Sequence, residues 1–523
     1  MPVNSGYSPT TSEESVAVGC DSIINCDAMH NQGHYQSLGQ TTALSPVVGS
    51  SSSESSLGCL TTISGKISEF RVANHHRATS KRQTGEEGML ATLIQVVGPF
   101  LVAGIGSMCT GLLLDVVKSW DNFTMIDTLI TLVPTLLGLK GNLEMTVTAR
   151  LCTAANLGVL DDPRVLGRFL RDDLLLTQFQ ATIVSLLASL LTLSIQAMKD
   201  PSNLSWSSCL IVVSSAVVTA AVACLFLGLL MTGVVALSRK MHINPDNVAA
   251  PLASSLGDIS TLALFAYISL GMYSLRDHLY VPIALMCFLM VLCPLWGYLA
   301  CQSAEVRAHL QHGWLPILLA MCISLGAGYI LDAATTDLPQ APAYVPVVSG
   351  VCGNLLVILI CRMTTVLRKN TILGHNDVTV AQIRSDNPFR VGDNHFESLT
   401  ATFRLLLLLP ILAHSIFLPI ISFFTQEVSI TAVYLFVFLS TVFVHALIML
   451  FLTREMVLRL WTWGVDPDVA SIPILTAVAD LTGGAFTCAI FVTLSRLQDP
   501  SIMLPRQDVE LFTPLVDPLT QSS

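Results

Sequence analysis

The sequence predicts an all-α polytopic membrane protein, built from two parallel five-helix repeats and one linking transmembrane helix, with about 11 spans. Of its 523 residues 52% are apolar and only 12% are charged, whereas about 25% of the residues in soluble domains are charged. Apolar stretches of about 20 residues, long enough to cross a bilayer core of roughly 30 Å, alternate with short polar loops. Sequence motifs also recur at offsets of 212 and 222 residues, as expected of an internal repeat.

The apolar stretches give the predicted spans in order along the chain. They lie near residues 89–117, 125–148, 174–198, 207–238, 246–274, 279–300, 313–331, 343–366, 401–423, 428–453 and 467–495. Residues 1–88 are rich in Ser, Thr and Gly and lack an apolar period, so we expect a disordered cytoplasmic N-terminal tail. Residues 497–523 are expected to form a short extracellular C-terminal tail.

The distribution of positive charge predicts the orientation, because Lys and Arg residues near spans are retained in the cytoplasm. With the N-terminus inside, 20 of the 26 Lys and Arg residues fall in cytoplasmic segments. The sequons at Asn122 and Asn203 then lie outside, where glycosylation can occur. We expect an integral protein of the plasma membrane with a cytoplasmic N-terminus and an extracellular C-terminus.

Two motif pairs define the repeats. The segment from Val133 to Arg150 reappears from Val345 to Arg362, and the pattern Pro-Asp-x4-Pro-x6-Asp ends at Asp258 and again at Asp480. We assign repeat one to residues 89–275, a linking helix to 276–312 and repeat two to 313–496. Each repeat has an odd number of spans, so the linking helix makes the repeats parallel, related by an axis along the membrane normal.

Asp258 and Asp480 carry the main functional prediction. Each lies 13 residues beyond the proline at which its helix is expected to start, which is roughly 20 Å along the helix axis. A carboxylate at that depth costs about 2.5–3.5 kcal/mol unless it faces a partner, a cavity or an ion. A protonated, hydrogen-bonded aspartate is the simpler explanation for one such residue. Its recurrence at the same repeat position favours a functional site.

The oxygen-rich surroundings of the two aspartates predict a hard cation. Neighbouring hydroxyl and amide groups add oxygen ligands but no thiolate or imidazole, a set that suits Mg²⁺ or Ca²⁺ rather than copper or zinc. Mg²⁺ keeps most of its waters and is usually held by one or two carboxylates. Calcium and manganese also fit this chemistry. The predicted ligands are Asp258, Asp480, Asn142, Asn354, Ser254 and Thr476.

Other polar and small residues of the repeated motifs are candidates for lining the pathway. They are Glu144, Gly141, Gly353, Asp246 and Asp468. The glycines allow close helix approach, and we expect Pro134 and Pro346 to free a backbone carbonyl within their helices. Repeat two has Leu356 in place of Glu144. Glu144 is therefore expected to form an ion pair with Lys140, four residues earlier.

Four motifs resemble the eukaryotic solute carrier 41 family, whose members are relatives of the bacterial MgtE magnesium channels. They are Leu139-Lys-Gly-Asn-Leu-Glu-Met-Thr146, Arg150-Leu-Cys-Thr-Ala-Ala-Asn-Leu-Gly158, Asn244-Pro-Asp-Asn-Val-Ala-Ala-Pro251 and Ser255-Leu-Gly-Asp258. The resemblance covers roughly residues 89–495. It implies that an aspartate in the fifth helix of each repeat binds hydrated Mg²⁺, which places Asp258 and Asp480 at the site and lets one chain act as a monomeric pore unit.

The resemblance also implies Mg²⁺ efflux with Na⁺ as the coupling ion, although the sequence shows no recognisable Na⁺ site. The cytoplasmic gating domains of the bacterial relatives have no counterpart here, so their regulation is not carried over. Repeat two departs from the family pattern with Cys352 before Gly353 and with Ala479 before Asp480. A coupled exchanger and an uncoupled Mg²⁺ channel both fit these residues.

Three other function classes can be compared with the sequence. A net charge of −10, without a basic cluster, argues against a nucleic-acid partner. Intramembrane aspartyl proteases also use two aspartates, but their Gly-x-Gly-Asp motif is not met at Ser255-Leu-Gly-Asp258. We therefore expect neither an enzyme nor a bound cofactor. A scaffold that does not transport would tolerate replacement of both aspartates, whereas a transporter would not.

Overall fold

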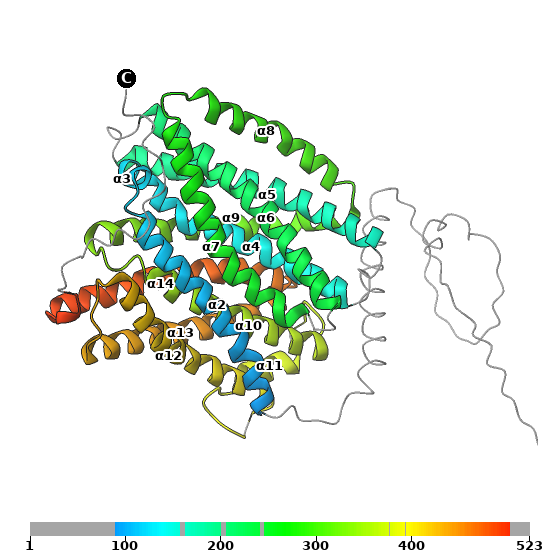
Figure 1. Ribbon diagram of the computed structural model, residues 1–523. Coiled ribbons are helices and arrows are strands. Elements are labelled where there is room, and N and C mark those ends of the chain that lie inside the picture. The colour runs from blue at the N-terminus through cyan, green and yellow to red at the C-terminus, as the bar shows by residue number, and fades with distance from the viewer. Residues whose placement is uncertain are drawn as a thin grey trace, which may run out of the picture. The chain divides into compact units, whose positions relative to one another are not determined.

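The computed structural model describes residues 89–156, 163–199, 205–240, 245–375, 377–392 and 394–502 (Figure 1). Regular structure in these ranges is helical, so the predicted all-α polytopic class is confirmed. The expected N-terminal tail lies outside the described residues, and so does the C-terminal tail beyond residue 502.

Eleven long helices occupy the places of the predicted spans. In chain order they are α2 (Met89–Val117), α4 (Thr128–Asn156), α5 (Pro163–Lys199), α6 (Trp206–Lys240), α7 (Pro245–Ser274), α8 (Tyr280–Ala300), α9 (Ala304–Asp337), α10 (Val345–Asn370), α12 (Glu397–Thr425), α13 (Ala432–Thr462) and α14 (Pro467–Arg496). The short elements are α3 (Asp121–Met125), α11 (Val378–Ser385) and η4 (Pro500–Ile502).

Among the described residues, ten helices are long and apolar enough to cross a membrane, and α4 is not one of them. Its mean hydropathy is lowered by Lys140, Asn142 and Glu144. All three side chains are buried, because α4 packs against α5, α6, α7, α9 and α14. The polar groups of α4 thus face other helices rather than lipid, as intramembrane charges must.

Prolines mark several helix starts. Helices α7 and α14 begin at Pro245 and Pro467, as the sequence predicted. Pro134 lies inside α4, but Pro346 occupies the first turn of α10, so the prediction that it interrupts a helix was wrong. A proline in the first turn breaks no helical hydrogen bond, because its missing N–H would have had no intrahelical acceptor.

Helix packing follows a two-fold pattern. In the first half α7 packs against α2, α4 and α6, and in the second half α14 packs against α9, α10 and α13. The first helix of each half also crosses to the other half. Helix α2 contacts α10 and α12, while α9 contacts α4 and α5. The two halves are therefore interlocked through their first helices.

Close backbone approaches at two glycines make this interlock possible. A Cβ atom at Gly111 of α2 would overlap the carbonyl oxygen of Ala343, just before α10, and one at Gly328 of α9 would overlap the carbonyl oxygen of Thr131 in α4. The glycines are 217 residues apart and their partners 212. Because only glycine lacks the Cβ atom, the same contact forms on both sides of the two-fold.

Helix α8 stands outside the two-fold pattern. It packs against α5 and α6 on one side of the bundle, opposite α12 and α13 (Figure 1). In the described part of the chain no additional helix covers α12 and α13 in the same way. The apolar surface of α12, including Leu408, Leu412 and Phe423, is exposed. In a membrane this surface faces lipid.

The interlock gives a stability prediction. Gly328→Ala should lower the free energy of unfolding by about 1–3 kcal/mol, the usual cost of overpacking a tight core, because backbone atoms of Thr131 cannot rotate away from the new methyl group. The measurement is thermal unfolding of the detergent-solubilised full-length protein.

Gly233→Ala is the matched control, because a Cβ atom there would meet nothing within 4 Å. Its helix should gain up to about 1 kcal/mol from the better propensity of alanine. An equal response of the two variants would contradict the close approach at Gly328.

Candidate functional site

The two halves meet at a cavity of about 100 Å³. Roughly 10–15 Å³ of such volume holds one water molecule, so the cavity has room for several. Equivalent residues of the two halves line it in pairs: Leu114 and Leu331, Val133 and Val345, Pro134 and Pro346, Gly138 and Gly350, Gly141 and Gly353, Asn142 and Asn354, and Asp258 and Asp480. The cavity therefore lies on the pseudo-two-fold axis.

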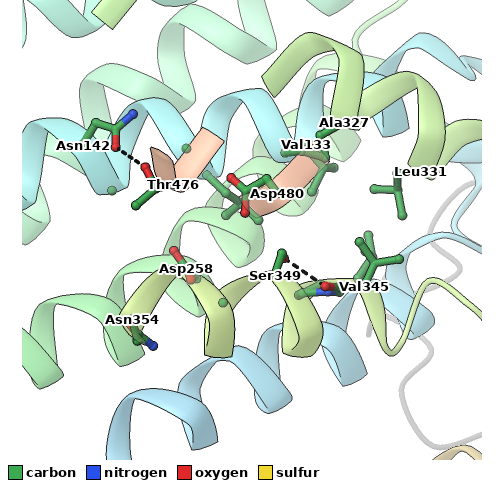
Figure 2. A pocket seen from close by; sticks show the side chains of 18 of the residues that line it. Val133, Asn142, Asp258, Ala327, Leu331, Val345, Ser349, Asn354, Thr476 and Asp480 are labelled. Carbon is green, nitrogen blue, oxygen red and sulfur yellow. Dashed lines mark hydrogen bonds between the residues drawn. The ribbon is translucent and has the colours of Figure 1, made fainter. Parts of the chain in front are cut away.

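Asp258 of α7 and Asp480 of α14 face this cavity from opposite sides (Figure 2). Both side chains are half-buried. Their common depth follows from the equal spacing from Pro245 and Pro467. Together they give the cavity wall a formal charge of −2, in a place where carboxylates need a counter-charge or water.

Backbone of the first half lies close to the carboxylate of the second. A Cβ atom at Gly138 of α4 would lie 3.6 Å from Asp480 Oδ2 and 3.0 Å from Ser324 Oγ. Ser107 and Gly350 make the equivalent contact on the other side, where a Cβ atom would overlap Ser107 Oγ. Gly138 and Gly350 serve close helix packing, whereas a Cβ atom at Gly141 would meet nothing within 4 Å, so the close approach predicted there was wrong.

A polar contact joins the halves across the cavity. Thr476 Oγ1 of α14 donates a hydrogen bond to Asn142 Oδ1 of α4 at 3.0 Å, and it also lies 2.8 Å from the carbonyl oxygen of Ile472 (Figure 2). A hydroxyl carries one proton, so it serves one acceptor at a time. The Asn142 amide is thus held within reach of the cavity without being locked to a single partner.

Lys140 and Glu144 of α4 form a buried ion pair, so the predicted pairing at four residues' spacing is confirmed. Glu144 lines the cavity. A Cβ atom on Gly257, the residue before Asp258, would overlap Lys140 Nζ and lie 2.9 Å from Glu144 Oε2. The glycine in Gly257-Asp258 therefore leaves the space that the ammonium group occupies.

Three predicted residues lie elsewhere or cannot be placed. Asp468 sits in the first turn of α14 and forms an ion pair with Arg368 at 2.7 Å, outside the lining of the cavity. The side chains of Ser254 and Asp246 lie outside the part of the structure that is described.

Sequence reasoning missed the lining residues Leu114 and Leu331. They were detectable, because they follow Gly111 and Gly328 by three residues at the same 217-residue offset.

The donor set of the cavity favours a cation that keeps its waters. Within the described residues, no group of three His, Cys, Asp or Glu side chains is placed to hold a metal ion. The wall offers two aspartates, the Asn142 and Asn354 amides and the Thr476 hydroxyl, together with Glu144, whose charge is paired with Lys140. A cavity that offers few direct ligands and has a wall with a charge of −2 suits a hydrated divalent ion.

Comparison with known proteins identified similar sequences. The family model for MgtE, described as a divalent cation transporter, matches residues 133–268 and 345–490. Solute carrier family 41 member 2 of Mus musculus is 38% identical over 430 residues, which cover 80% of this chain and 73% of the relative. Solute carrier family 41 member 3 of Rattus norvegicus is 36% identical over 410 residues, covering 78% and 88%. No solved structure matched the chain.

The contact at Gly257 gives a second prediction. Gly257→Ala alone should lower the thermal unfolding temperature, because the methyl group displaces Lys140 Nζ. With Lys140→Cys and Glu144→Leu, which copy the residues at the equivalent positions of the second half, the same alanine should be tolerated or stabilising by up to about 1 kcal/mol. Thermal unfolding in detergent measures both. An identical effect of Gly257→Ala in both backgrounds would show that Lys140 does not occupy that space.

Proposed function

Because the chain belongs to the solute carrier 41 family of MgtE-type divalent cation transporters, we propose that it moves hydrated Mg²⁺ through the cavity between its two halves. Asp258 and Asp480 are the principal binding groups. Asn142, Asn354, Thr476 and Ser254 contribute oxygen atoms, and Gly141 and Gly353 leave the cavity open where a side chain would project into it.

One observation carries this proposal. Two intramembrane carboxylates, one from each half, line a single cavity with room for several waters. Their charge balances one divalent cation. Outer-sphere binding through retained water needs only one or two carboxylates, which is the usual arrangement for Mg²⁺.

The same donor set distinguishes Mg²⁺ from Ca²⁺ in this proposal. Ca²⁺ takes six to eight direct oxygen ligands at about 2.3–2.6 Å. The Asn142 oxygen already accepts from Thr476, and the other neutral groups belong to separate helices. Gathering that many oxygens around a bare ion would require the interlocked helices to move, whereas the waters of a hydrated ion donate hydrogen bonds to the wall oxygens as they stand.

We propose Na⁺-coupled efflux at the plasma membrane, as the family resemblance implies, with an uncoupled Mg²⁺ channel as the alternative. In this proposal the N-terminus is cytoplasmic and the C-terminus extracellular. A single chain suffices as the pore unit, because residues 89–275 and 313–496 supply the two walls and residues 276–312 link them.

Replacement of the aspartates tests the proposed site. Asp258→Asn and Asp480→Asn should each reduce Mg²⁺ flux at least about tenfold, since each removes one of the two charges that offset the cost of placing a hydrated divalent ion within the membrane. Flux is followed with an intracellular magnesium dye in cells that express equal surface amounts of each variant, with and without external Na⁺.

Asp277→Asn, at an exposed aspartate between α7 and α8, is the control and should leave flux unchanged. Loss of flux in both cavity variants supports the shared site, and dependence on Na⁺ selects the exchanger over the channel. Full flux in both cavity variants would rule out the two-carboxylate site.

A further inference from the structure

The two halves differ at three positions that touch one another. In the first half these are Lys140, Glu144 and Gly257. The residues at the same places in the second half, 212 or 222 positions later, are Cys352, Leu356 and Ala479. A charged pair beside a glycine in one half thus corresponds to an apolar pair beside an alanine in the other.

In the first half the three residues form one unit. The ion pair joins the Lys140 ammonium and the Glu144 carboxylate, whose side chains are 3% and 6% exposed. Gly257 provides the space for Nζ. Gly257 immediately precedes Asp258, so the ammonium group lies beside the helix segment that carries the first cavity aspartate.

In the second half the same helix contact forms without charge. Cys352, Leu356 and Ala479 are each at most 3% exposed and belong to one apolar core. Helices α10 and α14 pack as α4 and α7 do. The fold therefore does not need a buried ion pair at this contact, and burying one is seldom more stabilising than a well-packed apolar pair.

The ion pair does change the charge of the cavity. Glu144 lines the cavity with Asp258 and Asp480, so three carboxylates face the cavity. Lys140 cancels one of them, so the net charge is −2. Affinity for hard cations rises with the number of ligand charges, and transport requires binding weak enough for release.

We propose that Lys140 is a specificity-determining residue which, by neutralising Glu144, holds the cavity at the charge of two carboxylates and so permits release of a hydrated divalent cation. This inference rests on the proposed function, since it assigns the affinity of that same cavity. It also assigns the two halves unequal roles. Asp258 lies next to the ion pair, whereas Asp480 lies next to apolar residues and interacts with the cation without a competing ammonium group.

A charge cycle tests the inference. Lys140→Met leaves three carboxylates and should tighten Mg²⁺ binding at least about tenfold, a cautious figure for one added charge acting on a divalent ion at an effective dielectric near 20. Glu144→Gln leaves Lys140 unpaired and should weaken binding by a similar factor. The double variant restores the charge and should return to within about threefold of the wild type.

Two readouts are made on the full-length protein. Equilibrium binding of Mg²⁺ is measured by calorimetry in detergent, and initial Mg²⁺ flux is measured in proteoliposomes that contain a magnesium dye. Lys140→Met should also lower the maximal flux, because release is slower, and should make Ca²⁺ a stronger competitor. Opposite shifts of the two single variants are the expected result.

Lys118→Met is the control for the loss of a buried, ion-paired lysine. Lys118 pairs with Asp115 and is 7% exposed, but neither residue of this pair lines the cavity, whereas Glu144 of the Lys140 pair does. The Lys118→Met substitution should lower the unfolding temperature without shifting Mg²⁺ affinity by more than about twofold.

Two results would overturn the inference. If Lys140→Met and Glu144→Gln both weaken binding, or both leave it unchanged, while only their unfolding temperatures fall, the pair is structural. Absence of flux in the wild-type protein would instead reject the proposed function, and the binding measurement would still decide the role of the pair.

Discussion

The packing of the first helix of each half against the other half is the constraint on which the rest of the structure depends. Gly111 and Gly328 bring α2 and α9 into backbone contact with the opposite half. Helix α2 also packs against α7, and α9 against α14. Each of these first helices therefore fixes the position of an aspartate-bearing helix relative to the other half. The cavity between Asp258 and Asp480 follows from these two contacts rather than from any direct bond between the aspartates.

The cost of charge in a membrane explains where the polar residues lie. Helix α4 carries Lys140, Asn142 and Glu144, and it packs against the long helices α5, α6, α7, α9 and α14. Lys140 and Glu144 pair with each other and Asn142 lines the cavity, as low-dielectric surroundings require of such groups. The helices that remain at the surface, such as α8 and α12, expose mainly apolar side chains. The helix with charged residues thus lies inside the bundle and the apolar helices lie at its surface. This arrangement places the polar side chains near the two-fold axis.

Because the chain contains an internal duplication, equivalent positions of its two halves can be compared directly. The second half shows how this helix contact packs when Cys352, Leu356 and Ala479 replace the charged unit. The fold needs a close contact between the second and fifth helices in each half. The ion pair beside Asp258, in contrast, is present in the first half alone. Homodimers built from identical subunits cannot carry such a difference, because symmetry would place the pair on both sides.

The sequence by itself determined the helices, the duplication and the depth of Asp258 and Asp480, because apolar length, proline position and spacing along a helix are local properties. It also determined the ion pair of Lys140 with Glu144, which lies within one helix. Only the tertiary structure decided which helices cross between halves, why residue 257 is a glycine, that Pro346 begins a helix, and that Asp468 pairs with Arg368. Apart from the start of α10, these features depend on residues at least 100 positions apart that meet at helix crossings, and no local pattern encodes that meeting.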